Sequence, residues 1–276
     1  MDAEELTSLF GPSIEDPDEA PPETFLLFSE TFPSGNLGFI DPHATTIPLT
    51  IHSHDLLIHQ SPSLLSSTRS RGTTGAVIWK VTPILATWLL APTPLRGVFD
   101  ATRTHVLELG CGAGGVLGLA MCRARRVRRY VFSDQAYVAR LLRRNVEENA
   151  PCGERGLGFV TLDWEETRVV PAMTGTEGVR SFDVVVACDC VYNDALVGPF
   201  VETCVDVCRL RSDDSEKDKK PTLCIVAQQL RDSDVFEAWM NEFHKAFQVW
   251  RVPDEMLPQE LQSGSGFSIH LGILRT

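Results

Sequence analysis

The chain has 276 residues, with 25 Lys and Arg against 37 Asp and Glu, so its formal net charge is −12. Arg69 is the first Lys or Arg, and residues 1–68 already hold eleven acids, which leaves 26 acids against 25 bases in residues 69–276. A nearly neutral body argues against a nucleic-acid-coating surface, so direct nucleic-acid binding is not predicted.

The hydrophobic fraction of 43% is ordinary for a globular protein, and about 200 residues are enough for one domain with a substantial core. No run approaches the ~18 apolar residues of a membrane span. The acidic N-terminus also lacks the basic start and apolar run of a signal peptide. We therefore predict a cytoplasmic monomer without a membrane span.

The eight cysteines contain no CxxC pair, and most of them lie in apolar runs. Cys188 and Cys190 alternate along a predicted strand end, and Cys204 and Cys208 share a helix face. Because a reducing cytosol keeps thiols free, we predict buried free thiols and no metal site.

Residues 1–24 are acidic and contain four prolines. This composition favours a loosely held segment, in which Leu6, Leu9 and Phe10 suit a short helix. We assign residues 1–45 to an acidic, partly disordered N-terminal extension and residues 46–276 to one domain that begins with a hairpin.

Strand and helix patterns alternate from residue 46 onwards. A hairpin is predicted over 46–51 and 56–60, before a Ser-, Thr- and Gly-rich loop at 61–75. Helices are then predicted at 77–90, 115–124, 136–149, 194–210 and around 235–243. Strands are predicted at 105–109, 130–133, 159–162, 182–188, 223–227, 247–252 and 267–274. This order predicts a doubly wound, Rossmann-like α/β fold with an antiparallel pair of strands at the edge of the sheet.

A glycine-rich turn follows the strand at 105–109 and leads into the next helix. Glycines let the backbone approach a ligand closely, and a helix N-terminus offers free N–H groups, so a nucleotide-like ligand is expected. Gly110, Gly112 and Gly115 spell GxGxxG, and Asp134 lies 19 residues beyond Gly115. That spacing would suit a dinucleotide-binding dehydrogenase.

The same turn also spells ExGxGxG, beginning at Glu108, which is the pattern of class I S-adenosylmethionine (SAM) methyltransferases. A full helix precedes the turn, and the sheet is predicted to end in an antiparallel pair. Asp163 and Trp164 close the third strand, where a carboxylate and a flat aromatic suit an adenine. We therefore favour the methyltransferase over the dehydrogenase.

Five strings resemble the family-16, seven-β-strand protein-lysine methyltransferases in order and spacing. They are GAVIW at 75–79, LELGCGAG at 107–114, SD at 133–134, LDW at 162–164 and CDCVY at 188–192. The resemblance covers about residues 47–275 and implies a seven-stranded methyltransferase sheet. Further strings are similar to the ribosomal lysine N-methyltransferase 5 group, which implies a large-subunit ribosomal protein as substrate: IHQS at 58–61, GTTG at 72–75 and QQLRD at 228–232.

The resemblance implies SAM as the methyl donor and S-adenosylhomocysteine (SAH) as the product. The implied cofactor-binding residues are Trp79, Glu108, Gly110, Cys111, Gly112, Asp134, Asp163, Trp164 and Cys188. Asp134 would accept from the ribose hydroxyls, and Trp164 would lie against the adenine. Cys188 departs from the family, in which this position is often Ala. Asp189 and Tyr192 match the family's DxxY motif at the mouth for a substrate lysine and are the predicted catalytic residues.

Methyl transfer to lysine needs a neutral amine aligned behind the methyl group. The reference pKa of lysine is about 10.4, and an apolar channel beside a sulfonium cation would lower it. Asp189 would guide and hydrogen-bond the ammonium, and the Tyr192 hydroxyl would fix the direction of the amine. Helix capping by Asp189 and plain packing of Tyr192 are the structural alternatives.

Three other functions stay open: a lysine methyltransferase with a non-ribosomal protein substrate, a methyltransferase for a small molecule or nucleic acid, and a non-catalytic SAM-binding module. The chain lacks an Asn-Pro-Pro-Tyr-type motif after the fourth strand, which disfavours the second. Asp189 and Tyr192 together disfavour the third. The predicted partner is therefore a protein substrate.

One dense basic cluster comprises Arg123, Arg125, Arg126, Arg128 and Arg129. Cations at a helix C-terminus complement its dipole, so a solvated helix end is the simplest interpretation. Contact with ribosomal RNA or with the acidic extension is the alternative. The extension itself is predicted either to attract a Lys-rich substrate or to cover this cluster.

Overall fold

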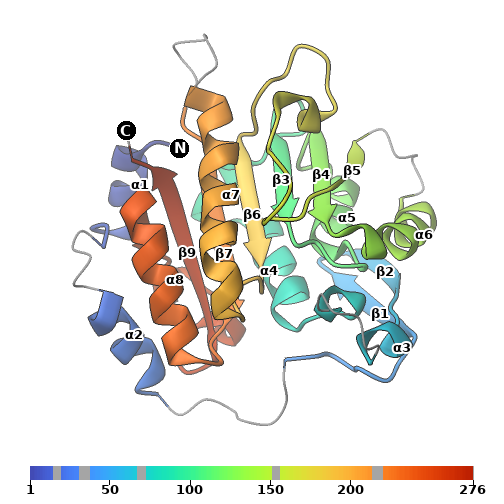
Figure 1. The fold of residues 1–276 in the computed structure, drawn as a ribbon, viewed down its shortest axis with the longest axis horizontal. Helices are drawn as coiled ribbons and strands as arrows, with labels where there is room; N and C mark the ends of the chain where they lie inside the picture. The colour runs from blue at the N-terminus through green and yellow to red at the C-terminus, as the bar shows by residue number, and fades with distance from the viewer. Residues whose placement is uncertain (15–19, 31–37, 67–72, 151–155, 213–219, 276) are drawn as a thin grey trace. The chain divides into compact units, whose positions relative to one another are not determined.

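The computed structural model describes residues 1–14, 20–30, 38–66, 73–150, 156–212 and 220–275 (Figure 1). The chain separates into two compact units. The central unit runs from Asn36 to Asp163, and the terminal unit combines Met1–Gly35 with Trp164–Thr276.

Three parallel strands form the sheet of the central unit, in the order β5-β4-β3. They are β3 (His105–Leu109), β4 (Arg129–Asp134) and β5 (Leu157–Thr161). Helix α5 (Val116–Arg123) connects β3 to β4, and α6 (Ala139–Asn149) connects β4 to β5. Because the strands are parallel, their carboxyl ends meet at one edge of this sheet, where ligands bind in such folds.

The N-terminal part of the central unit holds a hairpin of β1 (Thr46–Ile51) and β2 (His54–His59), which pair as a separate two-stranded sheet. Helix α4 (Val81–Leu90) follows the hairpin. The shorter segments of this unit are α3 (Pro62–Leu65), η2 (Thr74–Ala76), η3 (Pro94–Val98) and η4 (Ala136–Val138).

Four strands form the sheet of the terminal unit, in the order β6-β7-β9-β8. Strands β6 (Val184–Cys188) and β7 (Leu223–Gln229) are parallel. Strand β9 (Phe267–Leu274) runs antiparallel to both β7 and β8 (Phe247–Arg251). Helices α7 (Asp194–Ser212) and α8 (Ser233–Ala246) lie over one face of this sheet (Figure 1). The shorter segments are η5 (Pro171–Thr174), η6 (Asp254–Met256) and η7 (Gln259–Leu261).

The predicted fold class is confirmed. Seven strands are present, and β8 and β9, which have no α-helix between them, complete the antiparallel β7-β9-β8 edge that the sequence predicted. Each predicted strand is present, with bounds that agree to within about two residues. Among the helices in the described part of the chain, none is long and apolar enough to cross a lipid bilayer.

The helix predicted over 77–90 begins later, at Val81. The Ile78 N–H donates to Gln60 Oε1 at 3.0 Å, and the Ile78 carbonyl accepts the Ile40 N–H at 3.2 Å. Because the Ile78 carbonyl is paired with Ile40, it is not available to accept the N–H of residue 82, as a helix over 77–90 would require. Trp79 therefore precedes α4, and its assignment to that helix was wrong.

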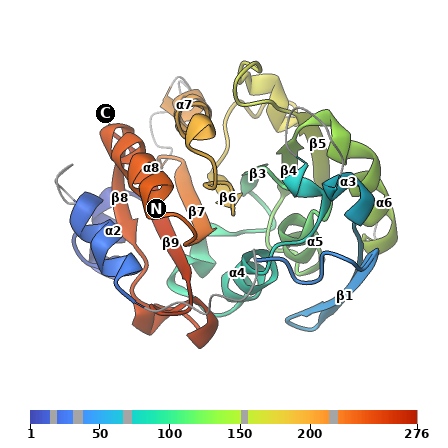
Figure 2. The same ribbon diagram turned by 60° about the horizontal axis from the view of Figure 1, so that its bottom comes forward.

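The N-terminal segment contributes two helices to the terminal unit, α1 (Ala3–Phe10) and α2 (Ala20–Phe28). Helix α1 starts with a capping box and buries Leu6 and Phe10, which confirms the predicted short helix. Helix α2 lies beside α8 in both ribbon views (Figures 1 and 2), and the rings of Phe28 and Phe236 are 5.8 Å apart. Sequence reasoning did not anticipate α2.

Residues between these two helices pair with strand β8. The Ile14 N–H donates to the Val249 carbonyl at 2.8 Å, and Gln248 Nε2 donates to Ser13 Oγ at 3.0 Å. An open strand edge is a template for pairing with other chains, so this short bridge protects part of the edge.

Candidate active site

The glycine-rich turn joins β3 to α5 in the central unit. Gly110, Gly112 and Gly115 have φ values of 66°, 63° and 56°, the left-handed region that disfavours other residues. A Cβ on Gly112 would stand 3.1 Å from the Gly75 carbonyl oxygen, and one on Gly115 would stand 2.4 Å from Leu142 Cδ1. The conformation therefore favours glycine at all three positions, and a side chain at Gly112 or Gly115 would also crowd a neighbouring residue.

Backbone and side-chain hydrogen bonds hold the turn in place. The Cys111 N–H donates to the Ser133 carbonyl at 3.0 Å, and the Gly112 N–H donates to Asp134 Oδ2 at 2.8 Å. The Ala113 N–H donates to the Gly75 carbonyl at 2.7 Å. The predicted site residues Cys111, Gly112 and Asp134 thus meet directly at the carboxyl ends of β3 and β4.

Asp134 ends β4 and accepts two backbone N–H groups, from Gly112 and, at 2.7 Å, from Gln135. Burial raises the pKa of Asp134 to about 6, and the two hydrogen bonds oppose that rise. The carboxylate is therefore mostly ionised at neutral pH, with lone pairs left to accept further hydrogen bonds. A ribose diol is the kind of donor that such a group suits.

Asp163 follows β5, at the end of the central unit. The residue before it, Leu162, donates its N–H to the Asp134 carbonyl at 3.0 Å. This bond continues the pairing of β4 with β5 and brings Asp163 to the same strand edge as Asp134. Its proposed contact with adenine stays a prediction.

Glu108 lies inside β3 and is only 1% exposed. Its Oε2 accepts the Tyr130 hydroxyl at 2.9 Å. Burial, with a smaller contribution from the charge of Asp134, raises the pKa of Glu108 to about 8. The carboxyl is thus mostly protonated at neutral pH, and direct cofactor contact by Glu108 stays a prediction.

Trp79 lies in the segment between η2 and α4. Its ring centroid is 4.4 Å from that of Phe39, and its Nε1 donates to the Thr74 carbonyl at 3.1 Å. Thr74 and Gly75 belong to η2, and Gly75 also accepts from the turn. The indole is therefore tied to the segment that supports the glycine turn.

The residues of the central unit fit SAM chemically. Asp134 offers a buried carboxylate at a strand end, beside a glycine turn in which a Cβ at Gly112 would crowd the Gly75 carbonyl. Such a carboxylate suits the ribose hydroxyls, and a turn at a helix N-terminus lets a nucleoside approach the backbone. Trp79, Gly110, Cys111, Gly112, Asp134 and Asp163 are the central-unit residues that would hold it.

Asp189 follows β6 in the terminal unit. Its φ of 61° is left-handed, and it is one of three such non-glycine residues in the described part of the chain. A non-glycine residue in this conformation costs about 1–3 kcal/mol, and such strain concentrates at functional sites. The Asp189 N–H donates to the Ala227 carbonyl at 2.7 Å, which fixes the backbone against β7.

Arg231 forms a bidentate ion pair with the Asp189 carboxylate. Its Nη1 lies 2.7 Å from Oδ1, and its Nη2 lies 2.6 Å from Oδ2. The Gln229 N–H adds a bond to Oδ1 at 3.3 Å. The Asp189 side chain is only 1% exposed, so this bidentate pair compensates a buried charge. These bonds lead to the last residue of β7 and the segment after it, and not to the start of α7, which disfavours helix capping.

The other predicted residues of the terminal unit are Cys188, Tyr192 and Trp164. Cys188 is the last residue of β6 and is buried, whereas Tyr192 is 40% exposed. The ring of Trp164 lies 5.1 Å from that of Phe200 on α7. Their assigned contacts with cofactor and substrate stay predictions.

Sequence reasoning did not single out three residues that the structure ties to these sites. Arg231 holds Asp189, and the Tyr137 hydroxyl accepts the Gly75 N–H at 3.1 Å. Asn145 contacts the glycine turn through the Ala113 carbonyl. Only Arg231 gave a signal, as part of a string noted for its family resemblance.

The described cysteines agree with the prediction of free thiols that are mostly buried. The described ones are free, and all of them except Cys122 are buried. Cys152 lies outside the described residues. Within the described residues, no group of three or more His, Cys, Asp and Glu side chains is placed to hold a metal ion.

A comparison with protein families supports the resemblance in the sequence. The profile of a family described as "Lysine methyltransferase" matches residues 59–239. This range includes the glycine turn, Asp134, the DxxY residues Asp189 and Tyr192, and Arg231. It covers more than half of the chain.

Individual relatives carry different names. A diaminohydroxyphosphoribosylamino-pyrimidine deaminase of Schizosaccharomyces pombe is 28% identical, over 84% of this chain and 53% of that protein. A ribosomal lysine N-methyltransferase 5 of Zygosaccharomyces rouxii is 29% identical, over 69% of this chain and 71% of its own length. The protein-lysine N-methyltransferase EEF2KMT of Mus musculus is 31% identical, over 66% and 52%. The chain spans about half the length of the first and third of these relatives.

The family match supports the predicted enzyme class, and the residues of the glycine turn fit SAM as its cofactor. The matched family is described as a lysine methyltransferase. This chain belongs to the lysine methyltransferase family.

Proposed function

We propose that this protein transfers a methyl group from SAM to the side-chain amine of a lysine in a protein, and that its substrate is a large-subunit ribosomal protein. The observation that carries the proposal is the constrained Asp189, which begins the DxxY motif within the matched range. The name of the Zygosaccharomyces rouxii relative supports the ribosomal substrate. A cytoplasmic location belongs to the proposal and rests on the free cysteines.

SAM supplies an activated methyl group, and SAH is its product. In this transfer, the Nζ lone pair of the substrate lysine would form the new N–C bond. The C–S bond of SAM would break, and its electron pair would stay on sulfur. The amine must first lose a proton to solvent or a nearby acceptor. The chain's residues therefore have two tasks, to hold the cofactor and to present a neutral amine.

The cofactor-binding task falls to the central unit. Asp134 would accept from the ribose hydroxyls, since its carboxylate is already oriented by Gly112 and Gln135. The glycine turn would take the methionine end against its backbone. Because these groups are fixed before binding, little conformational entropy is lost when the ligand arrives.

The substrate-binding task falls to Asp189 and Tyr192 in the terminal unit. A carboxylate can accept about four hydrogen bonds, and Arg231 and Gln229 supply three of these to Asp189. One acceptor position thus remains, and the lysine Nζ–H would have to reach it in a carboxylate that is only 1% exposed. The Arg231 guanidinium is always charged and would lower the pKa of an amine brought next to it, which favours the neutral nucleophile. The hydroxyl of Tyr192, a residue that is 40% exposed, would orient that amine.

The deaminase activity in the name of the Schizosaccharomyces pombe relative is not proposed here. Zinc-dependent nucleobase deaminases use a Cys-x-x-Cys pair together with a His or Cys ligand. This chain has no CxxC pair. A non-ribosomal protein substrate is the second candidate, because the mouse relative is named for EEF2.

The decisive experiment incubates the purified protein with isotope-labelled SAM and either large-subunit ribosomal proteins or EEF2, followed by mass spectrometry of lysine. We expect label on a ribosomal-protein lysine. Asp189→Asn and Tyr192→Phe should each abolish or strongly reduce labelling while SAH still binds in calorimetry. Label on EEF2 alone would shift the substrate to the second candidate.

Two other outcomes would overturn the proposal. SAH binding without label on any protein would make the chain a non-catalytic SAM-binding module. Failure of the wild-type protein to bind SAH or SAM would remove the cofactor assignment itself.

A further inference from the structure

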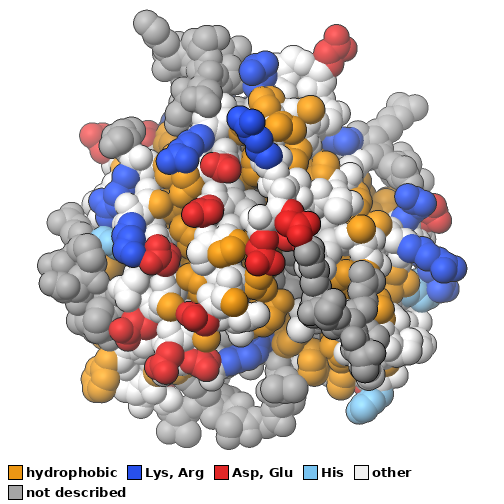
Figure 3. Space-filling view, viewed as in Figure 1, with side chains coloured by type: hydrophobic (Ala, Val, Ile, Leu, Met, Phe, Trp, Pro, Cys, Tyr) orange, Lys and Arg blue, Asp and Glu red, His pale blue; other side chains and the backbone are white. Residues whose placement is uncertain are grey.

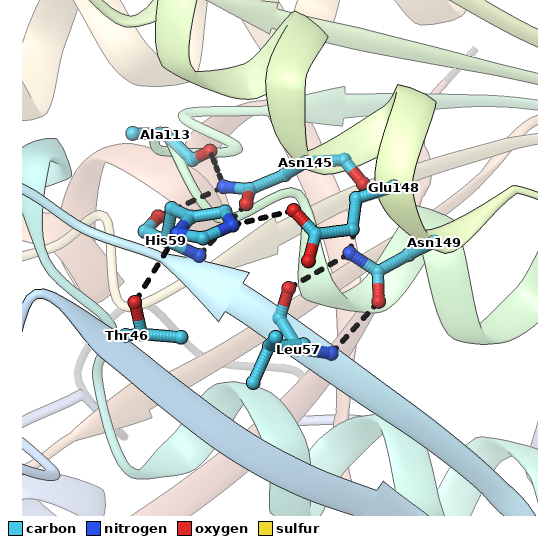
Figure 4. A network of polar contacts seen from close by, with 7 residues as sticks. All are labelled: Thr46, Leu57, His59, Ala113, Asn145, Glu148 and Asn149. Atoms are coloured by element: carbon cyan, nitrogen blue, oxygen red, sulfur yellow. Dashed lines mark hydrogen bonds and ion pairs between the residues drawn. The ribbon is translucent and has the colours of Figure 1, made fainter.

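Helix α6 carries two buried asparagines, Asn145 and Asn149, which are 0% and 3% exposed. They are one helical turn apart and therefore share a face of the helix. Asn149 Oδ1 accepts the Leu57 N–H at 2.8 Å, and Asn149 Nδ2 donates to the Leu57 carbonyl at 2.9 Å (Figure 4). The Asn149 side-chain amide thus accepts from the N–H and donates to the carbonyl of one residue of β2, as the backbone of a neighbouring strand would.

Asn145 repeats this pattern one step along β2. Its Oδ1 accepts the His59 N–H at 2.8 Å, and its Nδ2 donates to the His59 carbonyl at 2.9 Å (Figure 4). Leu57 and His59 are two residues apart, so their backbone groups point to the same edge of the strand. The two asparagines therefore pair with the edge of β2 as a third strand would, and they dock the N-terminal hairpin on α6.

The His59 side chain strengthens the same docking. Its Nε2 lies 2.5 Å from Glu148 Oε2, and its Nδ1 lies 3.2 Å from Thr46 Oγ1. Glu148 belongs to α6 and Thr46 to β1, so both strands of the hairpin are linked to the helix through one imidazole (Figure 4).

The two asparagines differ in their last hydrogen bond. Asn149 Nδ2 gives its second hydrogen to the Asn145 carbonyl, at 2.8 Å, within α6. Asn145 Nδ2 gives its second hydrogen to the Ala113 carbonyl, also at 2.8 Å, inside the glycine turn. Ala113 is 1% exposed, so an unpaired carbonyl at this position would cost free energy.

We propose that Asn145 is a positioning residue for the cofactor site: it fixes the glycine turn through the Ala113 carbonyl and ties the conformation of that turn to the docked hairpin. The Ala113 N–H is held by Gly75, so Asn145 completes the fixation of this residue from the other side. Gly112 and Gly114 flank it directly and have no Cβ to restrict their backbone. External hydrogen bonds must therefore supply the order that the glycines lack.

The consequence is pre-organisation. A turn that is already in its binding conformation loses less conformational entropy when a ligand binds, so its affinity is higher. The proposal deepens the cofactor assignment made above and rests on it. It concerns residues of the central unit alone.

The matched pair Asn145→Asp and Asn149→Asp tests it. Each variant keeps an acceptor for the β2 N–H and loses two donated hydrogen bonds, but only Asn145 loses the bond to the turn. We expect Asn145→Asp to weaken SAH binding in calorimetry by about tenfold, with an entropic loss, as one lost hydrogen bond predicts. Asn149→Asp should change the SAH Kd by less than about twofold.

Two further readouts separate positioning from general destabilisation. Hydrogen exchange of the Ala113 amide, without any ligand, should accelerate in Asn145→Asp and not in Asn149→Asp at equal thermal stability. In turnover assays, the KM for SAM should rise in Asn145→Asp with little change in kcat. If Asn145→Asp does not fold, Asn145→Ser provides the same comparison with a milder change.

Equal effects of the two variants on SAH binding and on Ala113 exchange would overturn the proposal, since Asn145 would then only dock the hairpin. Failure of the wild-type protein to bind SAH would instead refute the cofactor assignment. The two failures are therefore distinguishable.

Discussion

At the scale of single residues, the structure adds a partner to the DxxY motif. Asp189 combines a left-handed backbone with a bidentate ion pair to Arg231. Both features fix the direction of its carboxylate. Arg231 is therefore a positioning residue in our proposal, because it acts through Asp189 and presents its remaining acceptor position to the substrate.

We expect Arg231→Lys to lower kcat by roughly tenfold or more, since an ammonium keeps the charge but cannot engage both oxygens in parallel. SAH affinity should stay within about twofold, because the cofactor groups assigned to the central unit are untouched. Arg211→Lys is the matched control, as Arg211 also pairs with an aspartate of the terminal unit, Asp183, at 2.7 Å. Equal losses of kcat in both variants would contradict the assigned role.

Glu108 predicts a pH dependence of stability. Its pKa rises from 4.5 to about 8 in the folded protein, so between these values the folded state keeps a proton that the unfolded chain has released. The folded state then binds more protons, and the free energy of unfolding falls as pH rises, by at most about 1.4 kcal/mol per pH unit. The stabilisation is complete below pH 4.5 and is lost by about pH 8.

Glu108→Gln should remove that slope, because glutamine does not titrate and still offers an acceptor to the Tyr130 hydroxyl. Urea denaturation at several pH values between the two pKa values measures it. A residual slope from Asp134 is expected in the variant, since its pKa is also raised, to about 6. An unchanged slope would show that Glu108 is already ionised in the folded protein.

At the scale of elements, periodic patterns made most of the fold predictable, and long-range packing decided the rest. Strand β9 has the bounds that the sequence predicted. Helix α2 was missed because its sequence begins with Ala20, Pro21 and Pro22, which signal a turn, although Pro is compatible with the first helical positions. What stabilises α2 is tertiary: Phe28 against Phe236, and Glu23 with Arg251 and His270.

At the candidate site, too, local sequence patterns made some residues predictable and long-range contacts decided the others. The glycine turn and Asp134 were predictable, since positive φ values select glycine and strand ends collect ligand-binding side chains. Arg231 is 42 residues from Asp189, and Asn145 is 86 residues from His59. No local periodicity encodes such distant pairs, so only the folded arrangement reveals them.

At the scale of the whole molecule, some acidic side chains of the N-terminal segment form ion pairs within the terminal unit. Asp2 and Glu5 pair with Lys220, and Glu23 accepts from His270 at 3.1 Å. Burial alone would raise the pKa of Glu23, but its hydrogen bond to His270 and the charges of His270 and Arg251 lower it overall. Figure 3 shows acidic and basic side chains interspersed over α7 and α8.

The side chains of the arginine cluster also form hydrogen bonds within their own unit. Four of its five side chains donate to main-chain carbonyls of the central unit: Arg123 to Asn149, Arg126 to Arg96, Arg128 to Thr102 and Arg129 to Leu157. This agrees with a structural role at the end of α5. Because these arginines already have partners in the central unit, they do not need the acidic extension to cover them. We therefore retain attraction of a Lys-rich substrate as the hypothesis for that extension.

Truncating the extension would be a poor test of that hypothesis, because Leu6 and Phe10 are buried and Ile14 pairs with β8. A change of charge alone is sharper. Glu15, Asp16, Asp18 and Glu19 lie outside the described residues and together carry four negative charges. Replacing them with Gln or Asn should raise the KM for a Lys-rich protein substrate at low salt and flatten its salt dependence.

The control replaces four exposed glutamates elsewhere in the terminal unit with Gln, which changes the net charge by the same amount: Glu177, Glu202, Glu255 and Glu260. We expect kcat and the SAH Kd to be unchanged in both variants, because neither touches the assigned sites. A KM that rises equally in both would attribute the effect to net charge and not to the extension. A KM with the wild-type salt dependence in the first variant would refute attraction by these acids, since screening acts only on charges that contribute to encounter.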